Sequence, residues 1–440
     1  MKCLDMLDGF GKPTKKPSRY LTEPELAAHI LAVRSLIHEL AREDISNEVL
    51  ELRSGRHSDT DRTLHKEHIL KKLKRISPGE SCQINSIIDH EGSIHSDNTE
   101  MAKILTNHWS RVFSSSDSDD GLLKKWMDSF FTRQGHNKWN TGLPPSDPGS
   151  WKVKKKHVKK AIASAKNSMP GPDGIPASAF KALGDLAVDV LHGVFEALSS
   201  DEAESMLCEA YKSMTMSEQH EFNNCILCCL PKKPSGFNAQ GEAFYEPGDT
   251  RPLNISNVDN RLLASAGRLA WEPILEKWVS KMQRGFLKGR VMLHNVLDID
   301  YEAMTISLRC KTGTIMLFDF KAAFPSVGHS FLINCLTYLG LPHHVMNFIR
   351  SMYNNNNCTL RMQGEDFPGF AMKGGVRQGC PFSPLLFAVC VDILLRMIAK
   401  RVPDACTKAF ADDIGCVIRN WGRDASILSK SLRNLAGFPI

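Results

Sequence analysis

Two adjacent aspartates near the carboxyl end of the chain have the side chains and spacing for metal-dependent chemistry. Asp412 and Asp413 follow Phe410 and precede the apolar run 414–418, which predicts a β-hairpin with both carboxylates at its turn. Neighbouring carboxylates repel each other unless a cation is bound. Because no His or Cys is adjacent to the pair, the ligands would be oxygen atoms only, which favours Mg²⁺ or Mn²⁺.

A third carboxylate, Asp319, stands at the end of another predicted strand. Residues 314–318 form a continuous apolar run of the kind that is buried on both faces of a sheet. We expect this strand to be central and to lie beside the hairpin, although 93 positions separate Asp319 from Asp412. Asp pairs are common in turns that do no chemistry, so the third carboxylate is what favours a metal site. Asp319 and Asp412 should lie close enough to share a cation.

A loop rich in glycine and proline lies between these two features. Residues 374–384 read Gly-Gly-Val-Arg-Gln-Gly-Cys-Pro-Phe-Ser-Pro and precede an apolar helix predicted over 385–398. Glycines of this kind allow the backbone to approach a bulky ligand closely. The loop is therefore a candidate binding element.

In this order, the strand aspartate, the glycine-proline loop and Phe-Ala-Asp-Asp resemble the A, B and C motifs of reverse transcriptases, most closely those of non-LTR (LINE-type) retrotransposons. Four upstream segments resemble the finger motifs of that family and the turn before them: 170–174, 229–233, 250–256 and 283–290. The resemblance covers about residues 150 to 425. It implies an α+β fold with right-hand polymerase fingers and a ferredoxin-like palm sheet.

The resemblance also implies an RNA-directed DNA polymerase, a nucleotidyltransferase that takes an RNA template, a DNA primer and dNTPs. Asp319 and Asp412 would ligate two Mg²⁺ or Mn²⁺ ions roughly 3.5 to 4 Å apart. Asp413 would either complete the site or lie just behind its ligands, because neighbouring residues on a hairpin point to opposite faces. The peptide oxygen of Phe320 would add a ligand.

Further positions of the resemblance imply contacts with the nucleotide. Phe324 matches the bulky residue under the incoming sugar, where a ring excludes a 2′-hydroxyl; packing in the core is its alternative role. Gln378 would contact the incoming nucleotide or the template, and Gly379 would let the chain pass close. One departure is Phe410, where the family usually has Tyr, and it keeps the aromatic ring.

Basic residues supply candidates for phosphate binding. Lys232 and Arg251 match the finger positions that hold the triphosphate, and Lys233 is an equal candidate because one sequence does not settle the register. The helix expected after residue 150 carries six lysines within 152–160. These lysines either neutralise phosphates or form a solvated helix face.

Composition is compatible with this reading without requiring it. Lys+Arg 55 against Asp+Glu 49 gives a net charge of +6, which suits a polyanionic partner. Thirteen cysteines at irregular spacings indicate reduced thiols, so we expect an intracellular protein, nuclear or cytoplasmic, that is not secreted and does not span a membrane. Cys225, Cys228 and Cys229 suggest zinc, but no second pair follows at ligand spacing and we expect no zinc.

Breaks along the chain suggest three regions. We expect an N-terminal helical connector over 1–145, fingers over 146–310 and palm over 311–440. Within the connector, helices are predicted over 22–42, 64–76 and 98–113, with two short strands over 84–89 and 93–95. The chain ends 27 residues after Asp413, so we expect the thumb to be absent.

Two alternatives remain open. A non-catalytic nucleic-acid-binding remnant of a retroelement would keep the fold without the chemistry; the missing thumb favours it, and the intact set of three aspartates argues against it. A group II intron-type maturase would share the motifs but needs a further RNA-splicing domain.

Overall fold

The structure is a computed structural model. It describes residues 46–47, 84–114, 147–213, 222–238, 241–309, 312–320 and 322–433. The chain divides into two compact units, Met1–Cys82 and Gln83–Ile440, and the second unit carries every candidate site residue. The helices expected over 22–42 and 64–76 lie outside the described residues. The region boundaries expected at 145 and 310 fall inside the second unit and stay predictions.

The second unit begins with a small ribbon and a helix, as predicted. These elements are β1 (Ile87–Ile88), β2 (Ile94–His95) and α3 (Asn98–Val112). Asp97 caps the helix, because its carboxylate accepts hydrogen bonds at 3.0 Å from the backbone N–H groups of Thr99 and Glu100. Met101, Leu105 and Trp109 recur at helical spacing and form the buried face of α3.

A second group of helices surrounds an aromatic cluster. It consists of α5 (Lys155–Ser164), α6 (Ala177–Leu183), α7 (Asp185–Ser199), α8 (Ala203–Ser213), α9 (Val258–Trp278), α11 (His329–Tyr338) and α12 (His343–Tyr353). Phe195 of α7 stacks on Phe348 of α12 with ring centroids 4.1 Å apart, and Trp271 of α9 meets Phe348 edge-on. Large aromatic rings at helix contacts bury much apolar area, so this cluster holds α7, α9 and α12 together.

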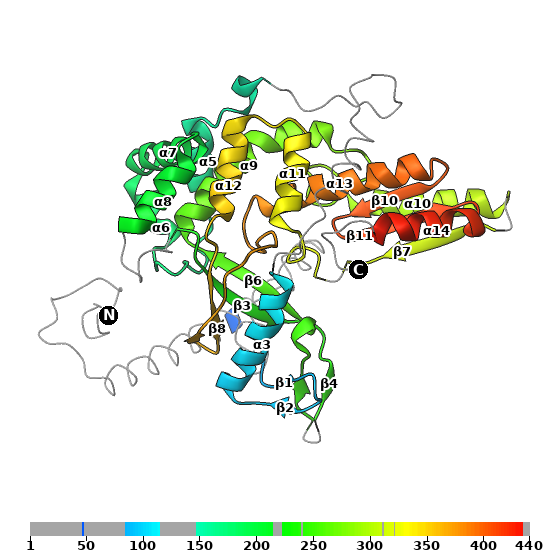
Figure 1. Ribbon diagram of the computed structural model, residues 1–440, viewed down its shortest axis with the longest axis horizontal. Coiled ribbons are helices and arrows are strands. Elements are labelled where there is room, and N and C mark those ends of the chain that lie inside the picture. The colour runs from blue at the N-terminus through cyan, green and yellow to red at the C-terminus, as the bar shows by residue number, and fades with distance from the viewer. Residues whose placement is uncertain are drawn as a thin grey trace, which may run out of the picture. The chain divides into compact units, whose positions relative to one another are not determined.

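A four-stranded sheet lies against α3 (Figure 1). Its order is β6 (Thr250–Ser256), β3 (Cys225–Pro231), β8 (Cys358–Met362) and β9 (Glu365–Phe367), with β3 and β8 parallel and the other pairs antiparallel. Leu227 and Leu360 point from the sheet into the same buried cluster as Leu105 and Trp109. Arg251, on the opposite face, is exposed.

The hairpin around Gly364 differs in part from its prediction. We expect from the sequence that the strand over 358–363 returns over 370–373. Residues 370–372 do pair with 356–358 at the start of β8, but β9 at Glu365–Phe367 is the hairpin partner of β8. Gln363 and Gly364 both have positive φ, 52° and 90°. Two residues with positive φ make the tight turn that suits a two-residue hairpin, so the chain reverses at once.

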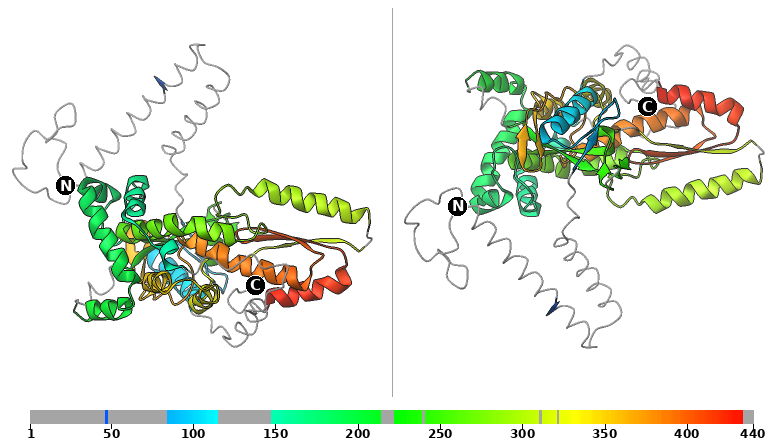
Figure 2. Two further views of the ribbon diagram at one scale, coloured as in Figure 1. Left: turned by 90° about the horizontal axis from the view of Figure 1, so that it is seen from above. Right: turned by 90° about the horizontal axis from the view of Figure 1, so that it is seen from below.

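A three-stranded sheet carries the carboxylates. Its order is β10 (Cys406–Phe410), β11 (Asp413–Ile418) and β7 (Thr314–Phe318), all antiparallel. α13 (Ser383–Arg401) and α14 (Trp421–Arg433) lie on one side of it and α10 (Met292–Ser307) on the other (Figure 2). The apolar helix predicted over 385–398 is therefore confirmed as α13. Together the helices and small sheets confirm a mixed α and β architecture.

The predicted place of β7 is wrong. β11 is the central strand and β7 is at the edge, and Ile315 and Leu317 are 51% and 78% exposed. Met316 and Phe318 face the core on one side. On the other side α10 packs mainly over β10 and β11. The apolar run therefore predicted the strand correctly. It did not predict that one face of this strand is largely exposed.

Candidate active site

The two adjacent aspartates lie at a hairpin turn, as predicted. Phe410 pairs with Asp413 across β10 and β11, so Ala411 and Asp412 form the turn. Ala411 has φ +61°, a backbone conformation that residues other than glycine rarely adopt. Asp412 is half-buried and Asp413 is exposed.

The third carboxylate lies beside this turn. Ile414 of β11 pairs with Phe318 of β7, and the antiparallel register continued by one residue sets Asp319 opposite Asp413. Burial raises the pKa of Asp412, the backbone N–H of Asp412 itself lowers it in part, and the charges of Asp413 and Asp319 add smaller increases. Asp319 and Asp413 therefore lie close enough to Asp412 for their charges to disfavour its ionised form.

The chemistry of this donor set fits a hard divalent cation. Three carboxylates supply oxygen ligands only, and a cation would relieve their repulsion. Among residues 84–433 that the structure describes, no three His, Cys, Asp or Glu side chains converge closely enough to hold a metal ion. Binding would thus require the carboxylates to turn toward a shared ion. Phe320 follows Asp319 directly and is 5% exposed; its carbonyl as a ligand stays a prediction.

Phe324 is held in an aromatic stack. Its ring lies parallel to that of Phe387 in α13, with centroids 4.6 Å apart and an interplanar angle of 9°. Phe286 meets Phe324 edge-on at 5.5 Å, and Phe286 has φ +63° and is 38% exposed. Phe324 is itself half-buried. Packing fixes the orientation of its ring, which is what a steric gate requires.

The glycine-proline loop docks on the four-stranded sheet. The carbonyl of Gln378 accepts a hydrogen bond from the N–H of Asn254 in β6 at 2.7 Å. A Cβ on Gly379, whose φ is +115°, would lie 2.4 Å from the carbonyl oxygen of Asn254. The close approach that Gly379 permits is therefore an approach to β6. The side chain of Gln378 is half-buried.

The predicted phosphate-binding residues lie at one end of the four-stranded sheet. Lys232, Lys233 and Arg251 are exposed, and Arg251 is paired with Leu230 of β3. The ammonium of Lys232 donates to the carbonyl of Gly248 at 3.1 Å. Lys232 directly follows β3, and Arg251 lies near the start of the neighbouring strand β6.

The lysine-rich helix is α5, and part of its charge is already paired. Lys155 forms an ion pair with Asp189 at 2.7 Å, and Lys159 with Asp185 at 2.9 Å, both on α7. These exposed contacts are weak individually. They nevertheless favour the reading in which the lysines form a solvated face of α5, a helix that packs on α7.

Comparison with known proteins identifies the region that contains this geometry. Residues 230–436 match the reverse transcriptase (RNA-dependent DNA polymerase) family. The matched range includes the three carboxylates, Phe324 and the loop with Gln378. The chain carries a reverse transcriptase domain.

The relatives that this chain matches are transposon and retrotransposon proteins. The chain is 24% identical over 272 residues to the transposon TX1 uncharacterized 149 kDa protein of Xenopus laevis, a match that covers 61% of this chain and 19% of that protein. It is 29% identical over 180 residues to the Pol polyprotein of the type-2 element R2DM of Drosophila melanogaster, covering 38% and 16%. A type-1 element R2 polyprotein of Bradysia coprophila is 25% identical over 282 residues, covering 63% and 29%. The chain spans less than a third of the length of these relatives.

Two residues of the reverse transcriptase domain that the sequence did not single out touch the site. Phe286 contacts Phe324, and the Gln283 side chain bonds to Ala411. Both belong to the segment 283–290, which the resemblance marks as a finger motif. The motif was visible in the sequence, but its contact with a hairpin more than 120 positions away was not.

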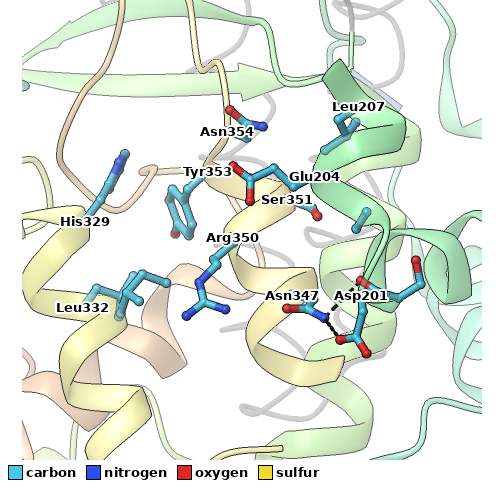
Figure 3. A pocket seen from close by; sticks show the side chains of 13 residues that line it. Asp201, Glu204, Leu207, His329, Leu332, Asn347, Arg350, Ser351, Tyr353 and Asn354 are labelled. Carbon is cyan, nitrogen blue, oxygen red and sulfur yellow. Dashed lines mark hydrogen bonds between the residues drawn. The ribbon is translucent and has the colours of Figure 1, made fainter. Parts of the chain in front are cut away.

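A cavity of about 380 Å³ lies between α8, α11 and α12 (Figure 3). Glu204, His329, Arg350 and Tyr353 line it. The imidazole of His329 lies 2.9 Å from the carbonyl of Gly375 in the loop. Burial lowers the pKa of His329 to about 4, with a smaller lowering by Arg377 and an opposing effect of the Gly375 contact. The three aspartates of the candidate site do not line this cavity.

The cysteines that the structure describes are free thiols. Burial raises the pKa of Cys225 to about 11 and of Cys229 to about 12, so both stay protonated at neutral pH. The described helices include none that is both long and apolar enough to span a membrane.

Proposed function

We propose that this chain is an RNA-directed DNA polymerase of a non-LTR retrotransposon, which extends a DNA primer along an RNA template with dNTPs. The observation that carries the proposal is the coupling of Asp412 with Asp319 and Asp413 across β7 and the β10–β11 hairpin, within a domain of the reverse transcriptase family. In this proposal the three-stranded sheet is a ferredoxin-like palm and the four-stranded sheet belongs to the fingers. The protein acts inside the cell, in the nucleus or cytoplasm.

Asp319 and Asp412 would hold two Mg²⁺ or Mn²⁺ ions, with Asp413 and the carbonyl of Phe320 completing the site. Two such ions make a primer 3′-hydroxyl nucleophilic and neutralise a triphosphate. The raised pKa of Asp412 follows from burial and from the neighbouring negative charges, and both effects make this carboxylate receptive to a cation. Asp319 is exposed, so it can reach the same ion from β7.

The nucleotide would lie between the aromatic stack and the basic end of the four-stranded sheet. Phe324, fixed by Phe387, would sit under the sugar and exclude a 2′-hydroxyl. Arg251 and Lys232 would grip the triphosphate, with Lys233 as the alternative to Lys232. Gln378 would contact the nucleotide or the template with its side chain, while its backbone carbonyl is hydrogen-bonded to β6.

The second candidate is a nucleic-acid-binding protein without catalysis. One observation favours it: among the described residues, Asp319, Asp412 and Asp413 are not placed so that all three could hold one metal ion. It predicts salt-dependent binding of template and primer with no metal-dependent extension.

Primer extension by the full chain on poly(rA)/oligo(dT) with Mg²⁺ separates the two candidates. Asp412→Asn should abolish extension because it removes a metal ligand, and it should barely change template–primer affinity measured by fluorescence anisotropy. Asp404→Asn is the matched control, since Asp404 is an exposed aspartate just before β10 that pairs only weakly with Arg423 at 3.7 Å. Binding without extension in the unaltered chain would support the second candidate. Extension that survives Asp412→Asn would contradict the metal assignment.

A further inference from the structure

Gln283 lies in the connection between α9 and α10 and is fully buried. Its segment joins the free edge of β10: Ala409 donates to the carbonyl of Met282 at 2.8 Å, and Arg284 donates to the carbonyl of Ala409 at 2.9 Å. Gln283 and Ala409 form a parallel bridge. The segment is therefore a short strand beside the hairpin that carries Asp412.

The side chain of Gln283 reaches the turn itself. Its Oε1 accepts hydrogen bonds from the N–H of Ala411 at 3.1 Å and from the N–H of Gly285 at 2.7 Å. Its Nε2 donates to the carbonyl of Ala411 at 3.1 Å. One amide group thus satisfies both backbone groups of the residue that precedes Asp412.

Ala411 also has a strained backbone. Its φ of +61° is unfavourable for a side chain with a Cβ, and such a conformation persists only where the surroundings over-determine it. Gly285 contributes to this restraint, because a Cβ on Gly285 would lie 2.0 Å from the nitrogen of Ala411. The segment and the turn are in direct backbone contact.

A second layer holds Gln283 in place. The guanidinium of Arg290 donates to the carbonyl of Gln283 and to those of Glu276, Val279 and Ser280. These bonds close the loop from which Gln283 projects. The chain of contacts runs from Arg290 to Gln283, then to Ala411 and to Asp412.

We propose that Gln283 is a positioning residue that fixes the Ala411–Asp412 turn and so aims the carboxylate of Asp412 toward Asp319. The effect on metal and catalysis rests on the proposed function, whereas the effect on the turn does not. The side chain of Gln283 bonds to the backbone of Ala411 and Gly285 and not to a carboxylate of the proposed metal site, so Gln283 acts through Ala411.

Three variants of the full chain test the proposal. Gln283→Met keeps the approximate shape and removes all three hydrogen bonds, and Gln283→Glu keeps the two acceptor bonds. Asn223→Leu is the matched control, because Asn223 is a 1% exposed amide whose Nδ2 donates to the carbonyls of Ser351 and Asn354, away from the hairpin. Thermal unfolding of Gln283→Met and Asn223→Leu measures the loss of stability that follows from removing any buried amide side chain.

Amide hydrogen exchange without metal is the first measurement. In Gln283→Met the peptide over 406–418 should exchange faster than in the unaltered chain, with the Ala411 N–H most affected, while Asn223→Leu leaves this peptide unchanged. Equal protection of the hairpin in Gln283→Met and the unaltered chain would overturn the proposal.

Binding of Mn²⁺, measured by electron paramagnetic resonance, is the second measurement. Gln283→Met should weaken Mn²⁺ binding about tenfold, the size typical for groups that orient metal ligands, and Gln283→Glu should weaken it less. Where extension is measurable, kcat should fall while KM for dNTP stays unchanged. Unchanged Mn²⁺ affinity in Gln283→Met, together with weakened binding in Asp412→Asn, would overturn positioning. Unchanged binding in Asp412→Asn would instead overturn the metal site of the proposed function, and hydrogen exchange alone would then decide whether Gln283 fixes the turn.

Discussion

Phe324 has a packing role in the structure and a gating role in the proposed function, and one substitution separates them. Phe324→Val should raise rNTP incorporation relative to dNTP, because the smaller side chain leaves room for a 2′-hydroxyl. It should also destabilise the fold by about 1 to 3 kcal/mol, since Phe324 loses its stack on Phe387. The measurement is the ratio of rNTP to dNTP extension. An unchanged ratio in a destabilised protein would leave packing as the only role.

His329 predicts a pH dependence of stability. Its pKa is about 4 in the folded chain against an ordinary value of 6.5, so between these values the unfolded chain binds a proton that the folded chain does not. The free energy of unfolding should therefore fall as the pH decreases from about 6.5 to about 4, by up to about 3 kcal/mol. Urea unfolding at several pH values checks this. His329→Gln should flatten the slope in that window, and an unaltered slope would assign the effect to other groups.

One glycine of the three-stranded sheet faces α10. A Cβ on Gly415 of β11 would lie 2.4 Å from Cδ1 of Ile299 in α10. Because Cδ1 is the far end of a flexible side chain, Ile299 can rotate away, and Gly415→Ala should destabilise the fold by only about 1 kcal/mol. Gly193→Ala in α7 is the control, because a Cβ there meets nothing within 4 Å and helix propensity favours Ala. Thermal unfolding compares the two variants, and a much larger loss of stability in Gly415→Ala would show that Ile299 is held in place.

Local sequence patterns predicted the elements that carry the site better than they predicted how those elements meet. The hairpin turn at Asp412, the strand before Asp319 and helix α13 each follow from short runs of apolar and turn residues. The edge position of β7 and the contact of Gln283 with Ala411 depend on residues far away in the sequence. No short pattern encodes such partners, because the same apolar run serves a central or an edge strand.

Nucleic-acid binding should depend on a few exposed cations of the chain and on salt. Affinity for template–primer should fall as salt rises, because neutralised phosphates release counterions. Arg251→Gln should reduce the slope of log affinity against log salt by about 1. Arg251 is exposed and would bind a phosphate in the proposed site. Lys155→Gln should change the slope less, because Lys155 is paired with Asp189. Anisotropy titrations at several salt concentrations measure both, and equal slopes would contradict the placement of the triphosphate.

The parallel pairing of β3 with β8 constrains how the molecule comes together in time. Cys225 of β3 pairs with Cys358 of β8, and the intervening chain includes α9, β7 and α12. During synthesis β3 and β6 can pair early, but they must wait for β8 to leave the ribosome before the sheet closes. Distant pairing of this kind slows folding and leaves a strand edge open meanwhile. An expression fragment that ends before residue 358 would keep that edge open permanently.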